Sequence, residues 1–596
     1  MAETRLGAAR LASIAGLCAL SMGIGLGSSG RLTYHEAFVA QAAREMIASG
    51  SVLVPTIDGR PWLEKPPLAF WLVAVAGRVA GGVTESAART PSAIAATLLA
   101  LGVAVLASRR FGPTVGWLAG LIQATSYWLV LRGRLAEADI LLACLVTGTI
   151  LAFDRLRMVE PGGEARGPHA RADRAGRVAS RGLARRLAAA SLVPGEGPGP
   201  GVGVGVGDAP RGPFPRGALI RINAPVEMMI STPVGAPNLR PDPPPDRPES
   251  PPSPLWRWAF FAGLGASALV KGLGFGAVLM GSVVAALVIW DRDRRAWGAL
   301  RDPRGWCLAA ALALTWPSLV AWRLPAAVSL WTLHVTDRLA SRPEHFIGGP
   351  WWQYGPAVLL QALPWTPLAL LGAGPSLRRA IGRRGGGDRL LWAWAVVPIL
   401  VLSMATVKNA HYAIHALPPF SAWAALGLAR VGLRLRLRGW SEGRIRRGAA
   451  ALFLVLGLGS GLGHLGLGPR FDRRGAEWGF SERIGRAIDG STPLAFLYED
   501  WDRKPYPTPF GPVPHDWAVR LYYLRRPASW RQGVDDLAAR PPGPGVYALF
   551  GRDRDLPALR RIGRVEALIR GPADRFDRTF TLFRITPGLG SVATPR

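Results

Sequence analysis

The sequence predicts a mainly α-helical protein whose helices cross a membrane many times. The chain of 596 residues is 49% hydrophobic, with a mean hydropathy of +0.19, yet its formal net charge is +31. These values are compatible only if apolar and charged residues are segregated, and long apolar runs do alternate with short arginine-rich runs. That alternation is typical of membrane-spanning helices joined by basic cytoplasmic loops. The positive charge is therefore explained without nucleic acid, which we exclude as a partner.

Eleven apolar segments come close to the length of about 20 residues that crosses the hydrocarbon core of a bilayer. The first follows Arg5 and Arg10 and has no A-x-A cleavage site, so we expect an uncleaved span rather than a signal peptide. The predicted spans cover residues 9–29, 89–108, 114–131, 138–154, 255–270, 273–290, 305–322, 353–373, 390–406, 411–428 and 449–467.

The arginines predict the orientation of the spans. Residues 109–112, 291–304, 376–389 and 430–448 hold 2, 5, 5 and 7 arginines, and they form alternate loops. Because cytoplasmic loops are enriched in basic residues, we expect these loops and the N-terminus in the cytoplasm. The chain is then a multi-pass protein of the inner membrane, with residues 33–86 and the C-terminal domain on the periplasmic side.

Composition divides the chain into four parts. Residues 1–157 and 255–467 carry the spans. Residues 158–254 are rich in proline, glycine and arginine and predict a disordered cytoplasmic insertion, because such a segment cannot bury a core. Residues 468–596 predict a small α/β domain, with strands at "PLAFLY", "GVYALF" and "TFTLFRI" and helices at "DWAVRLYYLRR" and "LPALRRIGRVEALI".

The chain contains only four lysines among 71 basic residues. Lys65, Lys271 and Lys408 all lie at predicted outer ends of spans, whereas Lys504 is expected at the surface of the C-terminal domain. Arginine would serve equally well as a snorkelling anchor, but a compact ammonium suits a phosphate. Pro66 restricts Lys65 to an extended backbone, so the "LEKPP" lysine is predicted to hold a phosphate at the membrane surface.

Two carboxylates at the same face have both a structural and a functional interpretation. Glu36 in "TYHE" has the T-x-x-E spacing of a capping box, which the pattern alone favours, and it also lies just outside the first span. Asp139 in "RLAEADILL" either caps the fourth span or belongs to a polar site near Arg132 and Arg134. A third polar group, Arg342, Glu344 and His345, precedes the aromatic pair Trp351-Trp352, which fits an interfacial aromatic belt.

Several motifs in order resemble one known family. "AREMIASG", "LEKPPLAFW", "EADILL", "LVKG", "GGPWWQY", "LPWTPL" and "KNAHYAIHALPP" resemble the lipid-carrier-dependent glycosyltransferases of the GT-C fold. The nearest members are the aminoarabinose transferases of lipid A and bacterial proteins similar to protein O-mannosyltransferases. The resemblance covers roughly residues 1–155 and 255–470 and implies a GT-C bundle of about 11 spans with outer juxtamembrane helices.

The resemblance also implies roles for particular residues. The family usually has Asp-Glu where this chain has His35-Glu36, so Glu36, helped by His35, is expected to act as base, together with Asp139. A basic residue that the family often has before the aromatic pair is replaced by glycine, so Arg342 or His345 is expected to substitute for it. The expected donor-phosphate ligands are Lys65, Tyr412, Lys408, Lys271 and Arg342, and the expected supporting residues are Glu64, Glu344, His345 and His411.

The implied reaction moves a sugar from a polyprenyl phosphate to a lipid, glycan or protein acceptor. No cofactor is expected, and the spacing of ligand residues neither requires nor excludes a divalent metal. Two alternatives stay open: a transporter or flippase for lipid-linked precursors, and an inactive membrane scaffold, which the histidine in the family's aspartate position suggests. The sequence therefore predicts a membrane glycosyltransferase whose partners are a lipid-phosphate sugar donor, an acceptor and the surrounding lipids.

Overall fold

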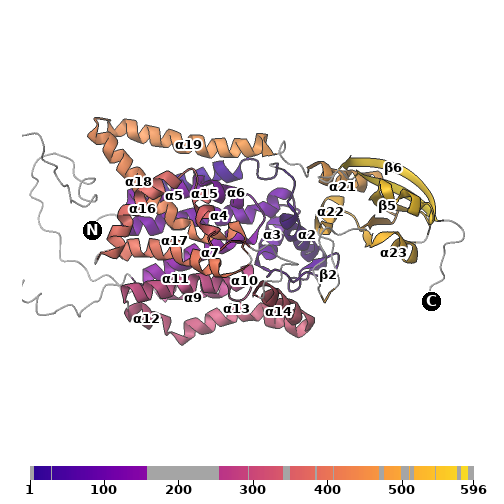
Figure 1. Ribbon diagram of the computed structural model, residues 1–596, viewed down its shortest axis with the longest axis horizontal. Coiled ribbons are helices and arrows are strands. Elements are labelled where there is room, and N and C mark those ends of the chain that lie inside the picture. The colour runs from indigo at the N-terminus through magenta and orange to yellow at the C-terminus, as the bar shows by residue number, and fades with distance from the viewer. Residues whose placement is uncertain are drawn as a thin grey trace, which may run out of the picture. The chain divides into compact units, whose positions relative to one another are not determined.

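The computed structural model describes a bundle of helices followed by a mixed β-sheet (Figure 1). The predicted insertion at 158–254 lies outside the described residues, except for Pro254, which begins a helix. The described residues are 6–28, 30–157, 254–292, 294–339, 349–382, 386–406, 408–468, 475–498, 509–510, 516–543, 545–573 and 579–587.

Helices occupy every predicted span. In the first half of the chain the elements are α1 (Ala8–Cys18), the π-helix η1 (Ala19–Gly23), α2 (Tyr34–Ser49), α3 (Leu68–Val79), α4 (Glu85–Phe111), α5 (Pro113–Thr125), α6 (Tyr127–Gly133) and α7 (Ala138–Arg157). In the second half they are α9 (Pro254–Ala266), α10 (Ala268–Lys271), α11 (Phe275–Asp291), α12 (Arg294–Leu300), α13 (Pro303–Arg323), α14 (Ala326–Leu339), α15 (Tyr354–Gln361), α16 (Thr366–Ile381), α17 (Gly386–Met404), the 3₁₀ helix η3 (Ala410–Ala416), α18 (Pro418–Leu437) and α19 (Glu442–Gly466).

The predicted count of eleven spans is not confirmed. Among the described residues, four helices are long and apolar enough to cross a membrane, namely α4, α13, α17 and α19, or up to six when two bent pairs are included. The segment predicted as a span at 353–373 is not one straight helix, because α15 and α16 meet at 115°. Pro364 lies in the break, where its missing N–H cannot continue the helical hydrogen bonds.

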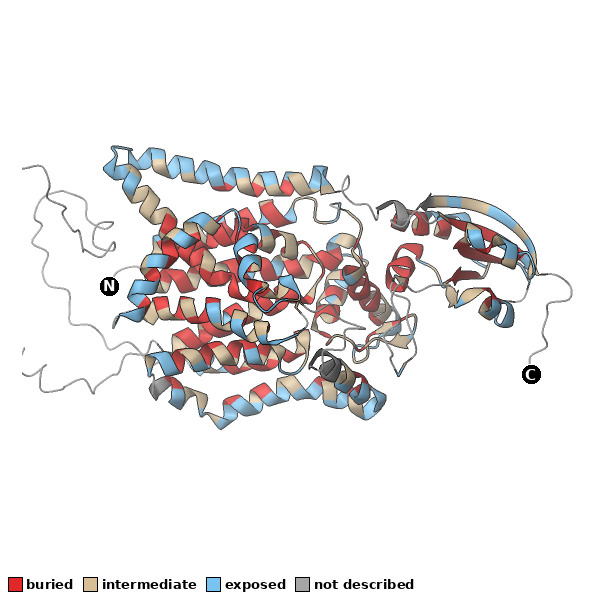
Figure 2. Ribbon diagram, viewed as in Figure 1, coloured by how far each residue is buried: buried red, intermediate tan, exposed pale blue. Residues whose placement is uncertain are grey.

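Helices α13 and α19 carry part of the apolar surface that the bundle leaves uncovered. Figure 2 shows both helices exposed along most of their length, and only 22% and 17% of their apolar windows are buried. On α19 the side chains of Val455 and Leu462 are more than half exposed, and on α13 Trp322 is largely exposed. Such surfaces are stable only in contact with lipid, in agreement with a multi-pass membrane protein.

Elsewhere in the bundle, small residues allow helices to approach closely. At the contact between α16 and α18, a Cβ atom added at Gly372 would lie 1.9 Å from the carbonyl oxygen of Trp423, and one at Gly427 would lie 2.1 Å from that of Leu368. In lipid, where helices gain little from the hydrophobic effect, such close backbone packing holds a bundle together. The contact fixes α18, and with it the preceding η3.

The C-terminal part contains a five-stranded sheet of order β4-β3-β5-β7-β6. Strands β4, β3 and β5 run parallel, and β5, β7 and β6 run antiparallel. The three predicted strands correspond to β3, β5 and β7, and the predicted helix at "DWAVRLYYLRR" is α22. The elements are α21 (Gly475–Ala487), β3 (Leu494–Leu497), α22 (Trp517–Leu524), β4 (Ser529–Arg531), α23 (Gly533–Ala539), β5 (Tyr547–Arg552), η4 (Asp553–Asp555), α24 (Leu556–Leu559), β6 (Gly563–Ala573) and β7 (Thr579–Pro587).

The prediction of one helix over "LPALRRIGRVEALI" is wrong. Only the four residues of α24 are helical, and from Gly563 onward the chain forms β6 at the edge of the sheet. Val565 and Glu566 of β6 lie opposite Ile585 and Arg584 of β7. Pairing with a neighbouring strand outweighs the local helical pattern, because propensity is weak beside tertiary hydrogen bonding.

Candidate functional site

The start of α2 is built around Glu36, whose side chain is fully buried. Its Oε2 accepts a hydrogen bond of 2.8 Å from the backbone N–H of Thr33, and the Thr33 hydroxyl accepts one from the N–H of Glu36. The predicted capping box is thus confirmed. It fixes the first turn of α2 next to the membrane-spanning helices.

Glu36 also forms a buried ion pair with Arg89 of α4. Arg89 Nε lies 2.7 Å from Glu36 Oε1, and the Arg89 side chain is 3% exposed. The same oxygen accepts the backbone N–H of Ala136 at 3.1 Å. Both oxygens of Glu36 are therefore occupied by bonds within the protein. The carboxylate ties together α2, α4 and the loop before α7, and in this arrangement it has no face open to an acceptor.

Beyond that loop, three segments far apart in the sequence meet around Asp139. Asp139 in the first turn of α7 forms an ion pair with Lys271 at the end of α10. Arg132 of α6 lies 3.7 Å from Asp139 and 2.8 Å from Glu137. His411 of η3 contributes its Nε2 at 3.7 Å from Asp139. We call Asp139, Lys271, Arg132, Glu137 and His411 the Asp139 cluster.

Lys65 is near enough to this cluster to act on it electrostatically. Its charge acts on both Glu137 and His411, and Glu137 is also influenced by Glu36. Burial raises the pKa of Glu137 above its ordinary value, although Arg132 opposes that shift. Because the charges of Glu36 and Lys65 both act on Glu137, we assign the "TYHE" and "LEKPP" motifs to one end of the bundle.

Aromatic rings support the cluster. The ammonium of Lys271 lies 3.9 Å from the ring centroid of Tyr412 and 5.1 Å from that of Phe275. The ring of Tyr412 contacts those of Phe275 and His411 at 5.3 and 4.6 Å. A lysine held over an aromatic face keeps its charge while losing water, which fixes the direction of its remaining N–H groups.

The other predicted site residues are only partly brought together. His35 is exposed at the start of α2, with its ring against Tyr34, and Glu64 is half-buried next to Lys65. Lys408 donates to the backbone oxygen of Ala405 and, within the described part of the chain, forms no bond to the Asp139 cluster. Arg342, Glu344, His345 and Lys504 lie outside the described residues.

Sequence reasoning missed Glu137 and Arg89. Glu137 stands two residues before Asp139 in "EADILL", so the motif itself carried the signal, but the spacing does not show which of the two acids pairs with lysine. Arg89 lies 53 residues after Glu36, and a helical pattern gives no indication of such a pairing. Among the described residues, no group of three or more His, Cys, Asp or Glu side chains is arranged to hold a metal.

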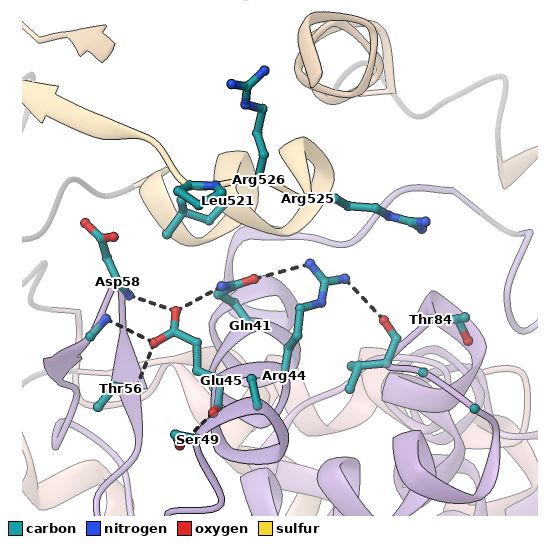
Figure 3. Close-up of a pocket in the computed structure, with 16 residues that line it drawn as sticks. Gln41, Arg44, Glu45, Ser49, Thr56, Asp58, Thr84, Leu521, Arg525 and Arg526 are labelled. Atoms are coloured by element: carbon teal, nitrogen blue, oxygen red, sulfur yellow. Dashed lines mark hydrogen bonds between the residues drawn. The ribbon is translucent and has the colours of Figure 1, made fainter. Parts of the chain in front are cut away.

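A groove lies where α2 meets α22 (Figure 3). This groove has a volume of about 890 Å³ and is separate from the Asp139 cluster. Glu45 accepts hydrogen bonds from Gln41, Thr56 and the backbone of Asp58, so it is saturated. The groove is lined by Gln41, Arg44, Glu45, Ala48, Ser49, Thr56, Asp58, Gly59, Gly81, Gly82, Val83, Thr84, Leu521, Arg525, Arg526 and Pro527.

The arginine side chains that line the groove differ in how many bonding partners they have. Arg44 stacks 4.2 Å from the ring centroid of Tyr522 and donates to that residue's carbonyl oxygen. Arg526 donates to three backbone carbonyl groups. Arg525 is exposed, adopts a left-handed backbone with φ of 56°, and has no side-chain partner among the described residues. Arg525 is therefore the cation that the groove offers to a ligand.

Comparison with known proteins agrees with this architecture. Residues 64–160 match the family model of dolichyl-phosphate-mannose-protein mannosyltransferases. The undecaprenyl phosphate-alpha-4-amino-4-deoxy-L-arabinose arabinosyl transferase of Edwardsiella ictaluri is 26% identical over 444 residues, which are 72% of this chain and 60% of that relative. The Erwinia tasmaniensis enzyme of the same name is 31% identical over 176 residues, 28% of this chain and 30% of that one. The match thus spans less than two thirds of these relatives.

Among solved structures, ArnT from Cupriavidus metallidurans, in a crystal structure with undecaprenyl phosphate, is similar with a TM-score of 0.63 and 16% identity over 98% of both chains. The protein is therefore a multi-pass membrane protein with the GT-C glycosyltransferase fold. Within that class, the chain is related in sequence to the aminoarabinose transferases.

Proposed function

We propose that the protein is an integral membrane glycosyltransferase that moves a sugar from a polyprenyl phosphate to an acceptor at the periplasmic face. The observation that carries the proposal is the Asp139 cluster, in which motifs from α6, α7, α10 and η3 meet at one end of the bundle beside Lys65. By analogy with the matched crystal structure, undecaprenyl phosphate is the carrier that we propose.

The charges of this region suit a phosphate. Lys65, Arg132 and Lys271 supply three positive charges, and Glu137 and Asp139 supply two negative ones, so one positive charge remains for the donor. The leaving group of the reaction is the lipid phosphate, and preorganised cations stabilise the charge that it gains as the sugar departs. In this proposal Lys65 and Lys271 hold the phosphate, and Tyr412 directs the ammonium of Lys271.

We assign the role of base to Glu137 rather than to Glu36. A buried carboxyl with a raised pKa is suited to accept a proton, whereas both oxygens of Glu36 are already bonded. The acceptor nucleophile attacks the anomeric carbon, the bond from that carbon to the phosphate oxygen breaks, and its electron pair stays on the phosphate. The proton of the nucleophile passes to Glu137.

The groove between α2 and α22 is proposed as the place where the body of the acceptor binds. Its volume of about 890 Å³ lies in the range typical of ligand sites, and Arg525 provides a cation whose side chain is unpaired among the described residues. An acceptor with anionic groups on a glycan fits this lining. Replacing Arg525 with Glu is expected to raise the KM for such an acceptor and leave the KM for the donor unchanged.

The main test is transfer of radiolabelled sugar from undecaprenyl phosphate in proteoliposomes, with endogenous envelope lipids, glycans and proteins as acceptors. The Lys65→Ala variant is expected to insert normally and to lose transfer, because its donor phosphate is no longer held. Arg78→Ala, which removes an exposed cation from the end of α3, is the matched control and is expected to remain active. Full transfer by Lys65→Ala would exclude the proposed donor site.

The same assay separates the two alternative functions. A flippase would move the intact labelled lipid across the bilayer without a change in its chemistry, and an inactive scaffold would do neither. Movement of unmodified donor without any glycosylated product would therefore overturn the proposal in favour of a transporter.

A further inference from the structure

Near the Asp139 cluster, a buried histidine has no hydrogen-bond partner for its ring nitrogens in the described part of the chain. His415 of η3 is 1% exposed, and neither Nδ1 nor Nε2 has a hydrogen-bond partner within the residues that the structure describes. A neutral imidazole carries one donor and one acceptor, and each of these groups destabilises the fold when it is buried without a partner. A leucine would fill the same position without that cost, so the imidazole indicates a partner outside the protein chain.

The backbone fixes where this ring lies. The carbonyl oxygen of His415 accepts a hydrogen bond of 2.9 Å from the indole N–H of Trp394, which is itself buried in α17. The imidazole centroid is 6.1 Å from that of Phe275, the ring that also lies beneath Lys271. The charges of Lys271 and Asp139 act on the imidazole. His415 and the lysine that we assign to the donor phosphate therefore lie against the same aromatic ring, that of Phe275.

Lys271 has bonding capacity left over in this arrangement. An ammonium has three N–H donors. One N–H is directed at Asp139, and a second faces the ring of Tyr412. The third N–H is left to donate to another acceptor. A buried water molecule bonds to two to four polar groups that would otherwise be unpaired, so water is the class of partner that suits both the imidazole and this ammonium.

We propose that His415 is a positioning residue of the donor site, and that its imidazole binds a buried water that orients the ammonium of Lys271 toward the phosphate. This inference rests on the proposed function. The water takes part in no bond change. It reduces the freedom of the lysine, so that the phosphate meets an ammonium already turned toward it.

The test compares His415→Leu with His415→Gln in the full-length protein, measuring melting in detergent and the KM and kcat of transfer from undecaprenyl-phosphate sugar. His415→Leu removes the group that holds the water, so we expect a KM for the donor raised about tenfold without a gain in melting temperature. His415→Gln retains a donor and an acceptor and is expected to restore the KM to within about threefold of the native value.

A control variant separates the role of His415 from a general effect of losing a histidine in the bundle. His464→Leu, on α19, removes a half-buried histidine that pairs with the carbonyl oxygen of Ser460, and it is expected to leave the KM for the donor unchanged. If His415→Leu is not recovered as folded protein, His415→Met takes its place, because a flexible thioether fills an irregular site.

The outcomes distinguish this inference from the function on which it rests. A more stable His415→Leu protein with an unchanged KM for the donor, or a glutamine variant no better than leucine, overturns the role of His415 alone. Absence of transfer by the native protein overturns the proposed function as well.

Discussion

The buried pair of Glu36 and Arg89 offers a direct test of what the acidic helix start does. We consider the Glu36→Gln variant, which removes the negative charge and keeps a single side-chain oxygen, enough for the bond from Thr33 or the bond from Ala136 but not for both. If the carboxylate is structural, as its saturated bonding indicates, the variant loses stability. If it were the base that the sequence predicts, the variant would keep its stability and lose transfer.

The expected magnitude follows from burial. Removing one partner of a buried ion pair typically costs about 3–5 kcal/mol, because the remaining charge is left without compensation. Arg89 keeps contacts to the carbonyl oxygens of Leu26, Gly30 and Arg31, so the lower end, about 3 kcal/mol, applies here. In a bundle of this size that corresponds to a melting temperature lowered by roughly 3–6 °C.

The measurement is thermal unfolding of the detergent-purified protein, followed by the loss of its monodisperse elution peak, alongside transfer at about 20 °C, well below the expected melting range. Arg89→Met is expected to destabilise by a similar amount. In the Glu36→Gln/Arg89→Met double variant neither charge remains, so the two losses should not add. A Glu36→Gln protein with native melting temperature and no transfer would refute the structural interpretation and return Glu36 to the role of base.

Three further predictions concern the site and the bundle. Burial raises the pKa of Glu137, so the base should become protonated at a pH above the ordinary carboxyl pKa of about 4.3, and kcat/KM should fall as the pH decreases through that value. A pH series checks this, because the residual kcat/KM of Glu137→Gln should not show this fall at low pH. Tyr412→Phe keeps an aromatic ring beneath Lys271, so its transfer rate should be about fivefold higher than that of Tyr412→Leu. Equal steady-state transfer rates for the two variants would contradict this prediction. Gly372→Ala places a Cβ atom 1.9 Å from the carbonyl oxygen of Trp423, so separation of α16 from α18 should cost about 1–3 kcal/mol and be visible as a lower melting temperature.

Local sequence patterns predicted the helices well and their shapes poorly. Each predicted span contains helix, because the apolar composition of a span is a property of the segment itself. The bends at 60° between α5 and α6 and at 115° between α15 and α16 were not predicted. At a bend, some backbone N–H and C=O groups lose their partners within the helix and need hydrogen bonds from a neighbouring segment. The N–H of Tyr127, for example, donates to the carbonyl oxygen of Leu363.

The same distinction holds in the C-terminal sheet. The β-strands with compact apolar runs were predicted, whereas β6 was mistaken for a helix because its residues "GRVEALI" suit either structure. Its strand conformation follows from pairing with β7, a contact that no local window contains.

For the candidate site, the sequence by itself determined which chemical groups are present and that they belong to motifs in a characteristic order. The retained lysines and the "TYHE", "LEKPP" and "EADILL" segments were identified as polar features of one predicted membrane face. The tertiary structure alone decided their partners: Glu36 with Arg89, Asp139 with Lys271, and Glu137 with Arg132 beside Lys65. The physical reason is that an ion pair depends on distances of a few ångströms between side chains on different helices, and those distances are set by packing, not by position along the chain.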